Sequence, residues 1–218
     1  GATLTYFLDE KFETDKDKRL ATEASLREKD ADVPFPGWEK LTSESLESEP
    51  RVMILVSDSD NKPIRWVEAR NEAGTHRVTW DLRLPAPDAI DLSTPEFVPP
   101  WSSEPTGPLA APGTYSAQLF VLSGSEVSPL GEAQQFRVKP VRSAADGTDY
   151  AEVAGYQQET AGFMRDISHA GEELGRMEDL LRHMKAAVVE APGASPALFG
   201  RLDAFGAELT RLRTRLYG

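Results

Sequence analysis

The spacing of the apolar residues changes from two to about three and a half near Pro140, and no single kind of secondary structure fits both spacings. Before this proline, stretches such as residues 74–84 alternate apolar and polar positions, as strands with one buried face do. After it, apolar residues recur in steps of four and three, as in helices that pack along a seam. The chain is therefore predicted to be mainly β with an α appendage, with a β-domain at 1–140 and a helical hairpin at 141–218.

Six segments of the β-domain have the composition of strands: 2–8, 51–57, 63–69, 74–84, 114–122 and 134–140. Turn-forming clusters and a stretch rich in proline separate them. This number of short strands predicts an immunoglobulin-like antiparallel β-sandwich. Within 74–84, His76 and Trp80 share one face, and we expect Trp80 to lie in the core.

Residues 9–50 interrupt this pattern as an acidic insertion. Thirteen Asp and Glu residues against seven Lys and Arg give it a net charge of 7 − 13 = −6, half of the −12 carried by the whole chain. Residues 15–31 are rich in helix-forming residues and predict a short surface helix, which prolines and a glycine then end. We expect Phe35, Trp38 and Leu41 to anchor the insertion to the domain.

Two apolar seams predict the hairpin. The first contains Phe163, Ile167, Ala170, Leu174, Met177, Leu181, Met184 and Val188, and the second contains Leu198, Leu202, Phe205, Leu209, Leu212 and Leu216. Pro192 and Gly193 end the first helix, Ser195 caps the second, and so short a connection forces an antiparallel coiled-coil pair. We expect the seams to match in length, and we expect leftover apolar side chains such as Tyr156 and Phe199 to meet the β-domain or a second copy.

Composition excludes several functions. The charge of −12 and a pI near 4.8 argue against nucleic acid or an anionic membrane as a partner, because an acidic surface repels phosphates. The chain has no cysteine, which rules out disulfides and thiolate chemistry. No apolar run approaches the length of a membrane span.

The chemically suggestive residues do not form a catalytic or metal-binding pattern. His76 and Asp81 are separated by an odd number of residues, so they lie on opposite faces of one strand and do not form a triad. Residues 58–69 lack the glycine and glutamate of a calcium loop. Asp179 and His183 share a helix face but offer only two ligands. We therefore predict no catalytic, cofactor-binding or metal-binding residues.

The order of several segments is similar to that of known families. Residues 74–83 (GTHRVTWDLR), followed by 109–121 (LAAPGTYSAQLFV), resemble the immunoglobulin-like or fibronectin type III-like module of the flagellar hook-capping protein. Together with 1–8 (GATLTYFL), 33–41 (VPFPGWEKL) and the hairpin, they resemble the C-terminal region of large secreted bacterial proteins. In those proteins a sortilin-like β-propeller of BNR repeats precedes this region, and they are described as glycosyl hydrolases.

This resemblance implies a secreted or periplasmic protein and a preceding propeller domain as the partner. It favours a non-catalytic accessory or interaction module, with the hairpin as a surface for self-association or for a protein partner. A carbohydrate-binding sandwich is the first alternative, with Trp38, Phe97 and Trp101 as stacking platforms. Part of a glycoside hydrolase is the second, and it requires a cleft with paired acids of perturbed pKa.

Overall fold

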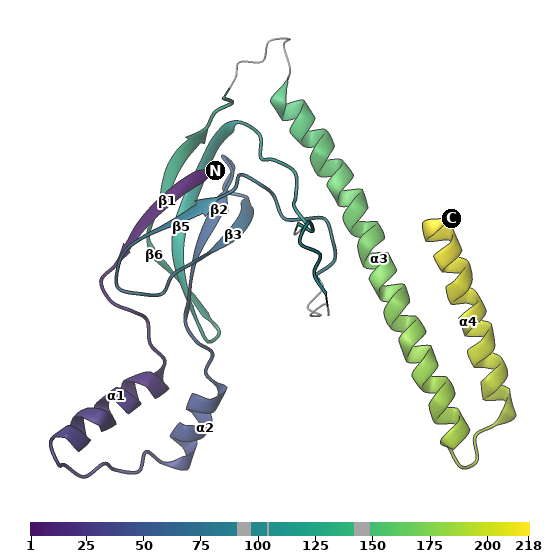
Figure 1. The fold of residues 1–218 in the computed structure, drawn as a ribbon, viewed down its shortest axis with the longest axis horizontal. Coiled ribbons are helices and arrows are strands. Elements are labelled where there is room, and N and C mark those ends of the chain that lie inside the picture. Colours follow the sequence, from purple (N-terminus) through teal and green to yellow (C-terminus); the bar gives the residue numbers. More distant parts are fainter. Residues whose placement is uncertain (91–96, 104, 142–148) are drawn as a thin grey trace. The chain divides into compact units, whose positions relative to one another are not determined.

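The structure is a computed structural model that describes residues 1–90, 97–103, 105–141 and 149–218 (Figure 1). Its strands are β1 (Ala2–Leu8), β2 (Arg51–Ser57), β3 (Pro63–Ala69), β4 (Gly74–Trp80), β5 (Gly113–Ser123) and β6 (Glu126–Val138). Its helices are α1 (Asp15–Glu28), α2 (Trp38–Leu46), α3 (Tyr150–Glu190) and α4 (Pro196–Tyr217). The fold is therefore a mixture of sheet and helix rather than mainly β, because α3 begins well before the predicted seam and the insertion contains a second helix.

The chain divides into two compact units. Unit 1 consists of Gly1–Leu84 and Leu109–Tyr150, and unit 2 consists of Pro85–Pro108 and Ala151–Gly218. The strands and the helices α1 and α2 belong to unit 1, whereas α3 and α4 belong almost entirely to unit 2. The proline-rich segment that follows β4 is thus grouped with the long helices.

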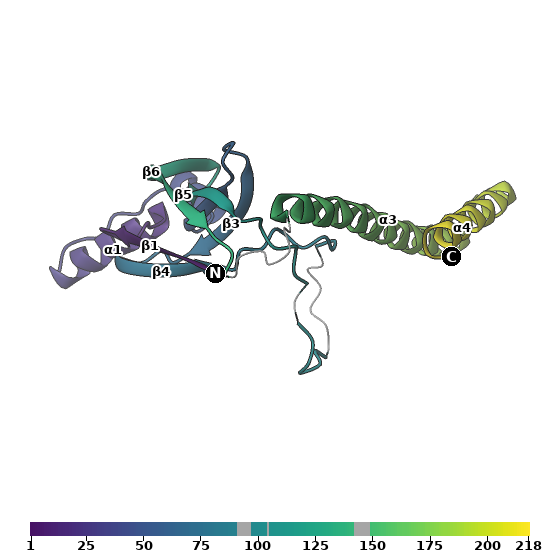
Figure 2. The ribbon, with the colours of Figure 1, turned by 90° about the horizontal axis from the view of Figure 1, so that it is seen from above.

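Unit 1 contains two antiparallel sheets, in agreement with the predicted antiparallel strands. One sheet pairs β1 with β4, and the other has the order β3-β2-β5-β6. The first pair runs without a register shift from Ala2 opposite Trp80 to Leu8 opposite Gly74. Figure 2 shows β1 and β4 on one side of unit 1 and β3, β5 and β6 on the other.

Side chains from both sheets form one core. Trp80 of β4 is only 1% exposed, and its ring lies 5.4 Å from that of Tyr115 on β5 and 6.2 Å from that of Phe136 on β6. Val56 of β2 completes the buried cluster. The Trp80 indole Nε1 donates to the carbonyl of Arg83 at 3.0 Å, so its polar end is satisfied although the ring is buried. The prediction that Trp80 lies in the core is confirmed.

The segment from 74 to 84 keeps its predicted alternation but ends earlier as a strand. His76 and Val78 are half-buried, while Arg77 between them is exposed. The strand stops at Trp80 because Leu82 adopts a left-handed φ of 63°. The Asp81 carboxylate accepts a hydrogen bond from the Arg83 amide at 3.0 Å, which holds this turn.

In unit 2, α3 and α4 run antiparallel. Lys185 pairs with Asp203 at 2.7 Å, and Glu178 pairs with Arg213 at 2.7 Å. The helices differ in length, with 41 residues in α3 and 22 in α4, so the expected match in length is wrong. The Tyr217 hydroxyl at the end of α4 lies so close to the glycine at 171 that a Cβ there would overlap it. The first half of α3 therefore extends past α4.

The described residues of Pro85–Pro108 form no helix or strand, as their prolines predict. The Ala89 amide donates to the Ser168 hydroxyl at 2.8 Å, which ties this segment to α3. Part of the predicted connection, 91–96 and 104, lies outside the described residues.

Candidate functional site

A group of charged side chains joins the two helices of the insertion. The Arg19 guanidinium of α1 contacts both carboxylate oxygens of Glu44 on α2, with its Nε at 2.8 and 3.0 Å and its Nη2 at 2.8 Å from Oε2. Its Nη1 contacts Glu23, which also pairs with Arg27 at 3.2 Å. The Glu44 side chain is almost fully shielded from solvent.

The contact with Arg19 keeps the Glu44 carboxylate ionised. Hydrogen bonds from Arg19 lower the pKa of Glu44, and the same bonds raise the pKa of Arg19. At the start of α1, the Thr14 hydroxyl accepts from the Asp17 amide, and hydrogen bonds from Thr14 lower the pKa of Asp17. A general acid needs a raised pKa, so this cluster has the character of a structural ion pair.

The neck of the insertion is where the chain enters it after β1 and leaves it before β2, and Asn71 holds these two segments together. Its Oδ1 accepts from the Phe12 amide at 2.9 Å, while its Nδ2 donates to the carbonyls of Phe12 at 2.8 Å and Pro50 at 3.2 Å. One side chain thus holds both the entering and the leaving chain. No local sequence signal predicts this role, because Asn71 stands in a turn-like stretch far from both partners.

The expected apolar anchors of the insertion are placed differently. Phe35 and Trp38 are exposed and pack edge to face against each other, with ring centroids 5.2 Å apart. Only Leu41 of the three is half-buried. The prediction that Phe35 and Trp38 anchor the insertion is wrong, since the ion pair and Asn71 make the fixing contacts. Trp38 instead begins α2, a helix that the sequence pattern did not predict.

The three predicted stacking residues all face solvent. Trp38, Phe97 and Trp101 are 76%, 70% and 83% exposed. Trp38 belongs to unit 1, whereas Phe97 and Trp101 belong to the proline-rich segment of unit 2. Each ring is therefore accessible, and two of them lie on the same segment.

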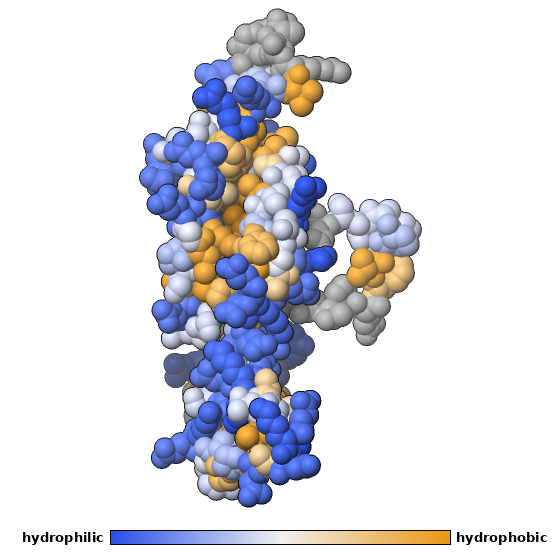
Figure 3. Space-filling view, turned by 90° about the vertical axis from the view of Figure 1, so that its left-hand side faces the viewer, coloured by the Kyte–Doolittle hydropathy of each residue, from blue (hydrophilic) through white to orange (hydrophobic). Residues whose placement is uncertain are grey.

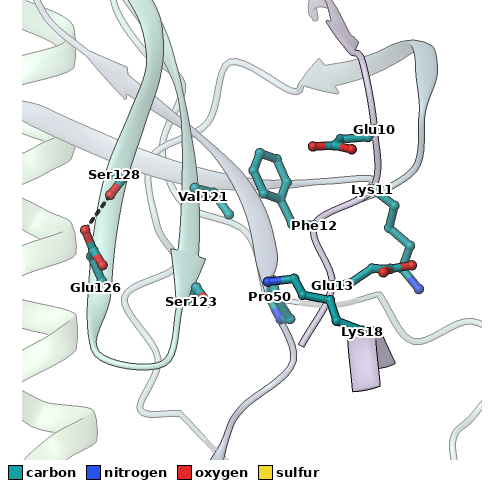
Figure 4. A pocket seen from close by; sticks show the side chains of 10 residues that line it. All are labelled: Glu10, Lys11, Phe12, Glu13, Lys18, Pro50, Val121, Ser123, Glu126 and Ser128. Atoms are coloured by element: carbon teal, nitrogen blue, oxygen red, sulfur yellow. Dashed lines mark hydrogen bonds between the residues drawn. The ribbon is translucent and has the colours of Figure 1, made fainter. Parts of the chain in front are cut away.

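A cavity of about 440 Å³ opens at one end of unit 1 (Figure 4). It lies between the segment after β1 and the hairpin of β5 and β6, and its apolar lining includes Phe12 and Val121. Glu10 and Glu13 line it from the first segment and Glu126 from the hairpin. The Ser128 hydroxyl donates to Glu126 at 3.2 Å. Lys11 and Lys18 also line it, so the cavity combines an apolar wall with a rim of mixed charge.

The histidines with possible chemical roles bond to backbone. A ring nitrogen of His76 lies 2.8 Å from the Glu72 carbonyl, and one of His183 lies 2.8 Å from the Asp179 carbonyl. The Asp179 carboxylate pairs with Arg182. Asp58 accepts from the amides at positions 60 and 62, both at 2.9 Å, which confirms a turn there. No group of three or more metal-ligating side chains occurs among the residues that the structure describes.

The seams of α3 and α4 separate into two rows with different environments. The inner row consists of Leu174, Leu181, Val188, Leu202, Leu209 and Leu216, all of which are buried or half-buried. Beside α4, the outer row consists of Met177, Met184, Leu198, Phe205 and Leu212, which remain 36–44% exposed. Phe163 and Ile167 of the first seam are 63% and 47% exposed and lie in the part of α3 that extends past α4. In both helices the outer row lies three residues after the inner row. Because the helices are antiparallel, both outer rows therefore lie on the same side of the pair.

Comparisons with known proteins give no relative from which a function can be taken. No protein-family model, no curated protein and no solved structure matches the chain. Within the described residues, no helix combines the length and the apolar character needed to cross a bilayer.

Proposed function

We propose that this chain is a non-catalytic interaction module that associates through the outer row of α3 and α4. The observation that carries the proposal is the different exposure of two apolar rows on the same pair of helices. Large apolar side chains that line one side of a helix pair are typical of bundle interiors. In this chain they remain exposed, so the pair has the features of half a four-helix bundle.

We propose a second copy of the chain as the occupant of this surface. Residues 151–218 contain eight Lys and Arg and ten Asp and Glu, a net of −2, so most of the acidic charge lies elsewhere. Association through these helices therefore meets little electrostatic repulsion. Two pairs related by a two-fold axis present the same outer row to each other, which is the usual geometry of a homodimer. On this basis the helices form an antiparallel coiled-coil hairpin that doubles into a bundle.

Sedimentation equilibrium with matched lysine substitutions tests this assembly. Met184→Lys places a charge in the outer row and is expected to leave a monomer at concentrations where the unchanged chain is a dimer. Leu180→Lys is the control, because Leu180 is also exposed but lies outside both rows. A monomeric unchanged chain, or equal weakening by both substitutions, would contradict the proposal.

For unit 1 we propose the immunoglobulin-like sandwich. The strand order β1-β4 and β3-β2-β5-β6 is that of strands B–E and C′–C–F–G in such a fold. The Tyr115 hydroxyl, near the start of β5, donates to the Ala111 carbonyl at 2.6 Å. This bond supports the assignment, because immunoglobulin-like domains contain a tyrosine corner at the same place.

The segment resemblance supports a place for the module in a larger exported bacterial protein, next to a propeller domain. We propose that the module stabilises or presents that neighbour and performs no hydrolysis itself. The ion pair of Arg19 and Glu44 supplies no general acid, because hydrogen bonds from Arg19 lower the pKa of Glu44. Glycoside hydrolysis by the isolated chain that is lost when Glu10 or Glu126 of the cavity is changed to Gln would contradict it.

Sugar binding is a second candidate, favoured by the exposure of Trp38, Phe97 and Trp101. Exposed aromatic rings provide the flat apolar faces on which sugar rings stack. A glycan array probed with the chain and with Trp101→Ala tests it. Binding that this substitution abolishes would support the second candidate, whereas no binding at any glycan would remove it.

A further inference from the structure

The free edge of β1 differs from every other sheet edge of unit 1. β1 pairs only with β4 in a two-stranded sheet, so its other side faces no strand of that sheet. Among the described residues, the backbone hydrogen bonds outside regular elements include none from β1. Every second amide and carbonyl of this strand therefore lacks a backbone partner, in a row with the spacing that a neighbouring strand matches.

The other edge strands carry features that oppose the addition of a further strand. β3 contains Pro63, and the pairing of β2 shifts register beside it. β6 contains Pro129 and the positive-φ Gly131, and β4 carries the exposed Arg77. Proline, irregular backbone and charge are the means by which proteins protect sheet edges. β1 (ATLTYFL) has none of them, although it is seven residues long.

The apolar interior is also incompletely covered beside this edge. The inward residues Leu4 and Tyr6 of β1 and Leu130 of β6 are only half-buried. Figure 3 looks at this flank of unit 1 and shows an apolar area between polar surfaces. The cavity with Phe12 and Val121 in its wall lies just beyond the end of β1. A free backbone edge, an apolar flank and a cavity thus follow one another along the same side.

We infer that the β1 edge is a docking site for an extended segment of another polypeptide, added as a strand antiparallel to β1. Its backbone would pair with the free amides and carbonyls, and apolar side chains at alternate positions would cover the half-buried flank. Residues 9–13, which follow β1, contain three acids and one lysine, so a basic residue is favoured at the beginning of the incoming strand. A second copy of β1 has no Lys or Arg to offer, which favours a different chain. This inference is independent of the helix surface in unit 2.

Amide hydrogen exchange with a synthetic peptide tests the site. The probe is the peptide Lys-Val-Thr-Val-Thr-Val-Thr-Val, and its control has prolines in place of the threonines. In the free chain, alternate β1 amides should exchange slowly because they bond to β4, and those between them should exchange fast. The probe should slow the fast set by about tenfold or more, and the control peptide should not.

Two neighbouring proline substitutions locate the edge. Amides at positions 4 and 5 point to opposite sides of β1. Proline at whichever position exchanges fast, Leu4→Pro or Thr5→Pro, should keep the melting temperature and weaken peptide binding about tenfold, while its neighbour should disrupt pairing with β4.

Unchanged exchange in the presence of the probe would overturn the inference, as would slow exchange of both sets in the free chain. If the fast-exchanging β1 amides became protected on raising the protein concentration without the peptide, the edge would instead pair with a second copy of the chain, and the inference would be overturned. None of these results depends on the state of the helices, so they leave the proposed dimer to its own test.

Discussion

The two units bury their apolar residues to different extents. In unit 1, the two sheets cover each other's apolar faces at the centre, where Trp80 is enclosed by residues from both sheets. In unit 2, two helices share one contact, which covers the inner row and leaves the outer row exposed. Two helices can bury both rows of such a seam in a coiled coil, but here α3 and α4 cover only the inner row. The difference supports the proposal that α3 and α4 of unit 2 provide a surface for assembly.

The largest effect is expected from Trp80→Ala. Removing this ring leaves a cavity between the sheets and is expected to destabilise unit 1 by about 3–5 kcal/mol. Urea unfolding followed by far-ultraviolet circular dichroism measures the change. Trp66→Ala is the control: Trp66 packs on Phe120 with ring centroids 5.2 Å apart but stays partly exposed, so a much smaller loss is expected. Equal losses would contradict a core centred on Trp80.

The next effect is expected in the inner row. Leu181→Asp places a carboxylate among Leu174 and Leu209 and is expected to destabilise the helix pair by about 3 kcal/mol. Thermal unfolding followed by helical circular dichroism measures it. Leu180→Asp should have little effect, because this neighbouring side chain is exposed. An unchanged melting temperature in Leu181→Asp would mean that the inner row is assigned to the wrong residues.

A smaller effect is expected from Asn71→Ala. The substitution removes three hydrogen bonds at the neck of the insertion, and a total of about 2 kcal/mol follows from typical values. Asn71→Asp keeps an acceptor for the Phe12 amide but loses both donors, so its effect should be intermediate. Faster hydrogen exchange in α1 and α2 of both variants reports the loosened neck. Equal protection in all three chains would argue against this role.

The smallest effect is expected on the pH dependence of the insertion. The pKa values of Glu44 and Asp17 are lowered in the folded chain, so both contribute stability above the ordinary carboxyl range. This contribution is expected to be constant from neutral pH to about pH 5 and to be lost as the pH falls through the lowered values. Exchange of α1 amides between pH 3 and 7, compared with Glu44→Gln, measures it. The variant should be less protected at neutral pH and less sensitive to acid; identical profiles would contradict the ion pair as the contact that joins α1 to α2.

The strands were predictable because each shows a local alternation of apolar and polar residues, and the apolar side of that alternation packs against the second sheet. Residues 74–80 show this, since the parity of their positions is enough to predict that Trp80 faces inward. Predictions failed where a contact joins segments that are distant in the sequence, or where the backbone conformation of one residue determines where an element ends. Asn71 bonds to residues 59 and 21 positions away, and Leu82 ends β4 early through its φ. The seams were recognisable, but which row is buried depends on the length of α4 and on how the helices face each other.

The exposed aromatics illustrate the same limit. Trp38, Phe97 and Trp101 stand near prolines or glycine, which indicated loops, but the sequence did not determine whether their rings are exposed. All three are exposed. The same reasoning assigned Trp38 an anchoring role in the insertion, which the structure contradicts. A short apolar pattern does not show whether a side chain holds a segment in place or lies on its surface. Here the ion pair of Arg19 and Glu44 joins the two helices of the insertion, and Trp38 is left exposed.

The concentration dependence of helix melting tests the contrast between the two units most directly. A dimer unfolds at a temperature that rises with protein concentration, whereas a self-contained fold does not. We predict that the helical transition of the unchanged chain shifts upward with concentration, that this shift disappears in Met177→Lys, and that the near-ultraviolet signal of Trp80 melts at a constant temperature. A helical transition that is independent of concentration in the unchanged chain would contradict the account.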